Sequence, residues 1–111
     1  MARKVKTVMG YPYELIEDTI FMIIKEFTKS SKNCKTYRGI KNAWFRSYDI
    51  INEKRDKSFS EYDFGKILNS TSIAMEKNIG KYIEPTLIFG EALHILEIIL
   101  GAEIYTFTDD D

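Results

Sequence analysis

Apolar residues recur at helical spacing in four segments of this chain, and the first of them follows Pro12. Its apolar positions lie one, three or four residues apart, which places them on one face of a helix. They are Ile16, Ile20, Ile23, Ile24 and Phe27. Proline suits a first helical turn, and lysines suit a last one because they complement the helix dipole. The spacing therefore predicts a helix over residues 12–29.

The second segment begins after Thr36, a residue type that caps helix N-termini. At 100° per residue, one arc of this helix carries Tyr37, Ile40, Trp44, Ser47, Tyr48 and Ile51. We expect this stripe to be buried. Aromatic and basic residues also alternate in platforms that bind single-stranded nucleic acid, but here helical periodicity accounts for the alternation.

Phe45 departs from this pattern, since it projects from the polar face of the same helix, near Arg38 and Lys41. A large exposed ring among charges is typical of a residue that binds a partner. The alternative is that a neighbouring loop covers the ring.

Two further helices follow. Ser58 with Glu61, or Ser60 with Asp63, can form the capping box of the third. Gly80 is a natural stop for it, and the fourth helix runs from Pro85 to a stop at Gly101. The expected buried stripe of the third helix is Phe64, Ile67, Leu68, Thr71, Met75 and Ile79. The fourth is apolar around most of its circumference, so we expect it to be the central helix.

Glycines at 39, 65 and 90 fall inside predicted helices, where they suggest close approach of another helix. The terminal segments "KVKTV" and "IYTFT" alternate and can pair as a small β-ribbon. The acidic residues 109–111 would then be solvated or lie near Arg3, Lys4 and Lys6. The fold class predicted is mainly α, a four-helix single domain over residues 1–111.

Charge is distributed unevenly along the chain. Residues 1–57 hold 13 Lys and Arg against 7 Asp and Glu, and residues 58–111 hold 3 against 10, so charges of +6 and −7 give the net −1. Either the halves neutralise each other, or each presents a charged face to a partner.

The strongest electrostatic feature is a basic ladder formed by Lys25, Lys29, Lys32, Lys35, Arg38 and Lys41. It either complements the first helix dipole and a solvated loop, or binds phosphates or an acidic protein face. A DNA reader would carry a basic excess overall, whereas the isoelectric point here is near 5.9. We therefore predict that Phe45, Arg38, Lys41, Lys25, Lys29 and Lys32 bind another protein, and that nucleic acid is not the partner.

No motif in the sequence indicates a particular chemical reaction. Glu91, His94 and Glu97 form a polar seam, but the chain has one histidine, so a di-metal site of the Glu-x-x-His type lacks its second imidazole. We predict neither a metal, a cofactor nor catalytic residues. Cys34 is the single cysteine and no apolar run is long enough for a membrane span or a signal peptide, which favours a cytoplasmic protein.

In its order of helices and its short acidic end, the chain resembles the tail assembly chaperones of long-tailed phages and, more broadly, accessory proteins of phages and mobile elements. The resemblance implies a non-enzymatic role in the cytoplasm of a bacterial host. Chaperones of that family bind tape-measure and tube proteins before assembly. The alternatives are a regulator that binds and inhibits a host protein or transcription factor, and a nucleic-acid-binding regulator. Homo-oligomers are compatible with each.

Overall fold

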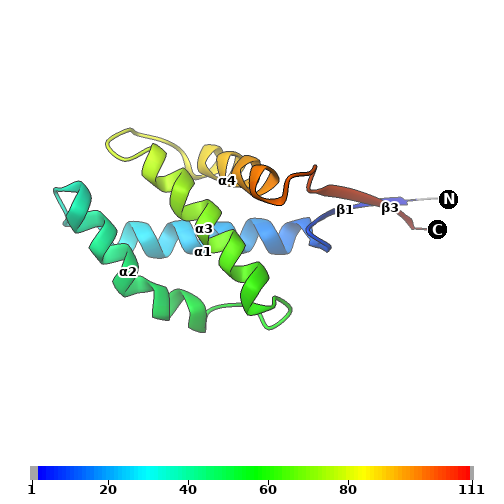
Figure 1. Cartoon of the computed structure of the whole chain (residues 1–111), viewed down its shortest axis with the longest axis horizontal. Helices are drawn as coiled ribbons and strands as arrows, with labels where there is room; N and C mark the ends of the chain where they lie inside the picture. The colour runs from blue at the N-terminus through cyan, green and yellow to red at the C-terminus, as the bar shows by residue number, and fades with distance from the viewer. Residues whose placement is uncertain (1–2, 111) are drawn as a thin grey trace.

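Four helices form the body of the molecule, and a small sheet projects from one end of it (Figure 1). The computed structural model describes the backbone of residues 3–110 and the side chains of residues 6–106. The elements are β1 (Arg3–Val8), β2 (Tyr11–Pro12), α1 (Tyr13–Ser30), α2 (Tyr37–Glu53), α3 (Glu61–Lys77), α4 (Pro85–Leu100) and β3 (Tyr105–Asp110). The mainly α, four-helix prediction is confirmed.

The terminal ribbon is confirmed too. The sheet has the strand order β2-β1-β3 and is antiparallel, with Val8 opposite Tyr105 and Arg3 opposite Asp110. Asp109 and Asp110 therefore lie across from Lys4 and Arg3, while residue 111 lies outside the described residues. Where the sheet joins the helical body, the Lys6 ammonium stands 4.1 Å from the ring centroid of Tyr13 and 4.3 Å from that of Tyr105. These cation–π contacts tie the ribbon to α1.

Local capping sets the helix boundaries. The Thr36 hydroxyl accepts the backbone N–H of Gly39 at 3.0 Å, as its position before α2 predicts. Of the two alternatives for α3, the Ser60 hydroxyl forms the cap and accepts the N–H of Asp63 at 3.0 Å. α4 ends at Gly101, whose φ of 70° is left-handed. α3 ends at Lys77, three residues before the expected stop at Gly80.

The central helix is α1, not α4. α1 packs against each of the other three helices and against β1 and β2, whereas α4 packs on α3 and α1. α4 is apolar around most of its surface, but Leu87 and Ile98 are 62% and 64% exposed because no described element covers them. The prediction that α4 lies at the centre was wrong, since it lies at the edge of the body.

The predicted stripes are buried where another helix faces them. In α3, Phe64, Ile67, Leu68 and Thr71 are buried, while Met75 and Ile79 near its end are half-buried. In α2, Trp44 and Ile51 are buried, with Ile40 and Tyr48 half-buried. Tyr37 is 56% exposed, against expectation, because it occupies the first turn of α2 beyond the reach of the core.

Glycines inside helices do not mark helix contacts. A Cβ built on Gly65 or Gly90 would meet nothing within 4 Å, so the close approach predicted there was wrong. At Gly39 a Cβ would lie 3.1 Å from the Thr36 hydroxyl oxygen. The neighbour is thus the capping residue rather than another helix.

Candidate partner-binding surface

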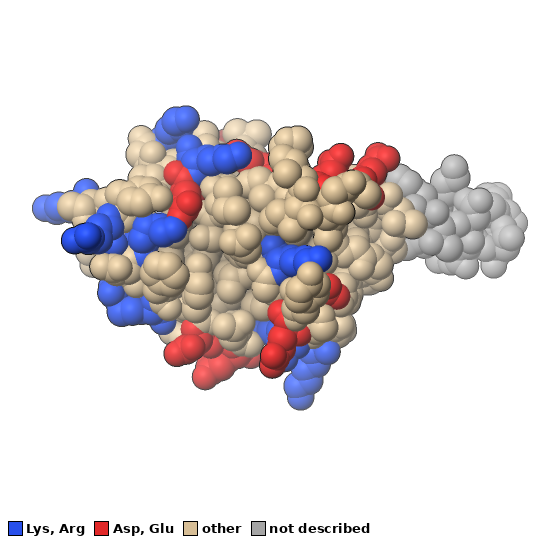
Figure 2. All heavy atoms as spheres, in the orientation of Figure 1, with Lys and Arg blue, Asp and Glu red and all other residues tan. Residues whose placement is uncertain are grey.

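Basic side chains gather at the end of the molecule opposite the ribbon, where α1 ends and α2 begins (Figure 2). Lys25, Lys29 and Lys32 are exposed there, and none of the three forms an ion pair with a carboxylate among the described side chains. Among the ion pairs seen within residues 6–106, Lys41–Glu76 alone joins the basic half of the chain to the acidic half. The two halves therefore neutralise each other only in part.

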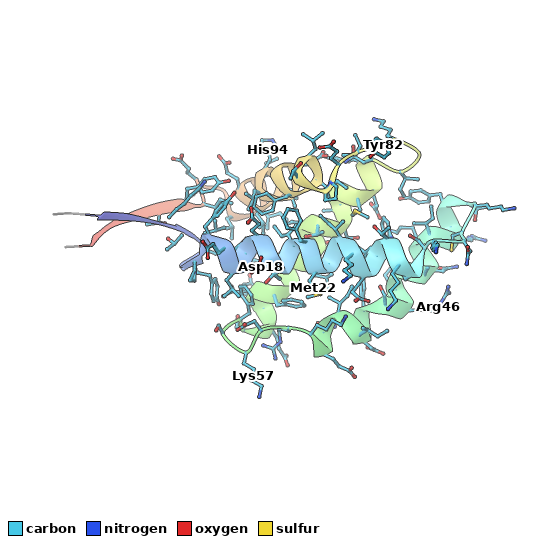
Figure 3. All side chains as sticks on the ribbon, turned by 180° about the vertical axis from the view of Figure 1, so that it is seen from behind. Asp18, Met22, Arg46, Lys57, Tyr82 and His94 are labelled. Carbon is cyan, nitrogen blue, oxygen red and sulfur yellow. The ribbon has the colours of Figure 1, made fainter. Side chains whose placement is uncertain are left out.

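These three lysines border an apolar groove of about 790 Å³ between α1 and the start of α4. The remaining lining residues are Phe21, Ile24, Thr28 and Pro85. The Phe21 ring also lies 5.6 Å from that of Phe89, centroid to centroid, which anchors this wall to α4. In Figure 3, α1 runs across the front of the molecule, with Asp18 and Met22 labelled on it. The groove thus combines an apolar floor with a rim of three lysines, Lys25, Lys29 and Lys32, called the lysine rim below.

The loop between α3 and α4 carries an exposed aromatic residue that is close in sequence to Pro85, one of the groove residues. Tyr82, three residues before Pro85, is 96% exposed, and Figure 3 shows it on this loop. Tyrosine is one of the residue types enriched among those that dominate binding energies at protein interfaces.

Phe45 belongs to a different surface, on α2. Its side chain is 59% exposed, as its helical phase predicts, and its ring centroid lies 5.4 Å from that of Tyr48. The Lys41 ammonium stands 5.8 Å from the Phe45 ring centroid. We call these three residues the α2 patch. Arg38 is exposed near the start of the same helix.

The six predicted partner-binding residues are therefore divided between two places. Lys25, Lys29 and Lys32 meet at the groove, whereas Arg38, Lys41 and Phe45 are on α2 and do not line it. Lys41 is already paired with Glu76 of α3 and is half-buried, so its charge forms a bridge between α2 and α3. Sequence reasoning missed Phe21, Ile24 and Pro85 as groove residues. The helical spacing predicts that Ile24 is a core residue, and it does not indicate that a groove lies between α1 and α4.

A smaller cavity of about 220 Å³ lies behind Thr28, which lines both spaces. Its other walls include Ser31, Asn78 and the Trp44 ring. Among the described buried side chains, the Trp44 indole N–H is the one polar group without a hydrogen-bond partner. The cavity has both polar and apolar lining residues and is large enough to hold a water molecule.

A buried carboxylate stabilises the junction of α1 and α2. Glu26 is 5% exposed and accepts a hydrogen bond from the Lys54 ammonium. That hydrogen bond, together with the positive charges of Lys54, Lys29 and Lys25, lowers the pKa of Glu26 below its ordinary value, although burial opposes the shift. Glu26 is therefore ionised at neutral pH and points toward α2.

The Glu91, His94 and Glu97 seam does not close into a site. Glu91 is turned to α3, where one oxygen accepts a hydrogen bond from the Asn78 amide at 2.8 Å and the other lies 3.6 Å from the Lys77 ammonium. His94 is exposed (Figure 3). Among the described residues, no three His, Cys, Asp or Glu side chains gather closely enough to hold a metal ion.

Comparisons with known protein families, with curated protein sequences and with solved structures found no match. Within the described residues, every helix is too short or too polar to cross a lipid bilayer.

Proposed function

We propose that this protein is a non-enzymatic binding protein that docks another protein in the cytoplasm of a bacterial host, as a phage-type assembly chaperone or adaptor. The observation that carries the proposal is the apolar groove with its lysine rim. Exposed apolar patches rimmed by polar residues are typical of protein–protein and membrane interaction sites and of ligand-binding grooves. Three lysines without carboxylate partners in the described part of the chain leave their charge available to that partner.

The α2 patch supports the proposal as a second contact. An aromatic ring that is 59% exposed among charged neighbours has the composition of an interface anchor. Because Lys41 is paired with Glu76, we assign recognition to Phe45 of the patch and to Arg38 nearby on the same helix, and treat Lys41 as the residue that positions Phe45.

A regulator that blocks a host protein or transcription factor would use the same surfaces, and the alternatives differ in what happens to the partner. A chaperone keeps its client soluble, while an inhibitor removes an activity. Nucleic-acid binding is a third candidate, favoured only by the basic ladder. The acidic second half of the chain opposes it by weakening long-range attraction of phosphates.

The proposal can be tested by cross-linking tagged full-length protein in the cells that naturally express it and identifying what is captured. Three variants accompany the parent: Lys29→Glu/Lys32→Glu for the lysine rim, Phe45→Ala for the α2 patch, and Arg46→Glu/Lys57→Glu as a charge-matched control. Arg46 and Lys57 are exposed and do not line the groove (Figure 3).

We expect one dominant protein partner whose capture falls at least tenfold in the rim variant and is kept in the control. Purified partner that scatters less light in the presence of the protein would identify a chaperone, and partner that loses activity would identify an inhibitor. Capture that is equal in all variants, or that disappears with nuclease treatment, would contradict a protein-binding groove.

A further inference from the structure

We infer that the occupant of the groove is an amphipathic helix of the partner protein that carries carboxylates along one edge of its apolar face. The inference rests on the proposed function and deepens it, because it names the chemistry that the groove recognises. Proteins commonly bind partners by accepting the apolar face of a helix in a hydrophobic groove.

The dimensions suit a helix. The α1 part of the lining runs from Phe21 to Lys29, which at 1.5 Å per residue is about 12 Å, and Lys32 follows just beyond the helix end. Pro85 closes the other side at the start of α4. An occupant of two to three turns would therefore cover the groove with apolar residues spaced i, i+3 or i+4, and i+7.

The lysine rim favours an occupant that carries negative charge. Lys25 and Lys29 are four residues apart in α1, so their ammonium groups stand about one turn apart on the same side of the helix. Two carboxylates one turn apart on the occupant would face them, and a third would reach Lys32. Since these lysines are exposed, such pairs contribute specificity and orientation more than affinity, which comes from the apolar floor.

Two other occupants fit less well. A second copy of the chain would offer Leu87 and Ile98 of α4 with two carboxylates between them, Glu91 and Glu97. Glu91 is already held by Lys77 and Asn78, which leaves one carboxylate for three lysines. A fatty acid would fill the floor but has a single carboxylate for three lysines. A helix with an acidic edge satisfies the floor and the rim together.

Designed peptides test this directly with the full-length protein. One fluorescent helical peptide of about 16 residues carries the apolar spacing given above with Glu along one edge, and matched peptides carry Gln or Lys in place of Glu. Binding is measured by fluorescence anisotropy at physiological salt, and amide shifts in NMR spectra locate the contact.

We expect the Glu-edged peptide to bind about tenfold more tightly than the Gln-edged one, and the Lys-edged one to bind least. Lys29→Glu/Lys32→Glu should reverse the order of the Glu- and Lys-edged peptides, whereas Arg46→Glu/Lys57→Glu should change affinity less than twofold. Thr28→Trp fills the groove at an exposed helix position and should abolish binding. Amide shifts should be confined to residues 21–32 and 85–89.

Several results would overturn the inference. The first two are equal affinity of the protein for the three peptides and amide shifts centred on α2. The third is tighter binding of dodecanoate than of the Glu-edged peptide. The fourth is a concentration-dependent amide shift of the groove residues in the protein alone, which would indicate that a second copy occupies the groove. If none of the peptides binds while cross-linked capture of a partner still depends on Phe45, the acidic-helix inference is wrong and the protein-binding function stands. If capture fails as well, both are wrong.

Discussion

Replacing Trp44 or Phe45 by alanine gives a sharp test of how α2 packs, because these neighbours on the helix have opposite environments. Trp44 is 3% exposed and its ring stacks on that of Phe27 with centroids 4.9 Å apart. Phe45 is 59% exposed. We expect Trp44→Ala to be strongly destabilising and Phe45→Ala to be nearly neutral.

The magnitudes follow from burial. Truncation of a buried Trp costs about 3–5 kcal/mol, including the cavity it leaves. For Phe45, full burial of a Phe side chain is worth roughly 1.5–3 kcal/mol, so the two fifths that are covered contribute about 0.6–1.2 kcal/mol. Alanine recovers up to about 0.5 kcal/mol through its higher helix propensity, which leaves a net loss below about 1 kcal/mol.

Denaturant unfolding followed by circular dichroism measures both values, provided that the m-value is unchanged. Trp44→Phe separates ring volume from hydrogen bonding: the indole N–H has no partner among the described residues, so we expect a loss of only about 1–2 kcal/mol. If Phe45→Ala proved more destabilising than Trp44→Ala, the assignment of the buried face of α2 would be refuted.

Three further predictions concern charge and chemistry. Lys54→Met removes the hydrogen-bonded cation of buried Glu26. Because the Lys54 side chain is 49% exposed and Lys25 and Lys29 remain nearby, the loss of stability should be about 1–2 kcal/mol at neutral pH. Because the folded pKa of Glu26 is lowered, its stabilisation is present above the unfolded pKa of about 4.3 and is lost as the pH falls through the folded pKa. Denaturant melts should therefore show the difference between the variant and the parent narrowing in acid, and a constant difference would contradict this. Purified protein should hold less than one transition metal per chain, with folding little changed by His94→Ala; elemental analysis that finds one tightly held metal would revive an enzymatic role. Gel shifts at physiological salt should show only weak DNA or RNA binding, in the range of about 10⁻⁴ to 10⁻⁶ M. A nanomolar complex abolished by reversing Arg38 and Lys41 together would favour a nucleic-acid-binding regulator.

Features that depend on neighbours in sequence could be predicted. The caps at Thr36 and Ser60 and the stop at Gly101 follow from local hydrogen bonds and backbone conformation, so the helix boundaries were correct to within a few residues. Features that depend on which helices and strands pack against each other could not be predicted from the sequence. The apolar circumference of α4 predicted a central position, but hydrophobicity alone does not determine how many faces of a helix find partners.

The candidate site shows the same division. Lys25 and Lys29 were identifiable as a cluster because α1 places them on one side, and Lys32 follows just after the helix. Phe45 was identifiable by its helical phase. The groove itself requires Phe21 and Ile24 of α1 to face Pro85, and residues 61 and 64 positions apart carry no local signal of that contact. The pairing of Lys41 with Glu76 likewise depends on how α2 and α3 are both placed against α1.

The pairing of β1 with β3 has a mechanical consequence. Arg3 and Asp110 are opposite each other at the same end of an antiparallel ribbon, beyond the helical body (Figure 1). A pulling force applied through these two positions would load the strand pairs one after another, starting at the outer end, instead of shearing them all at once. The ribbon should therefore unzip at low force, while the helices and the groove at the far end remain folded until tension reaches the contacts of Lys6 with Tyr13 and Tyr105.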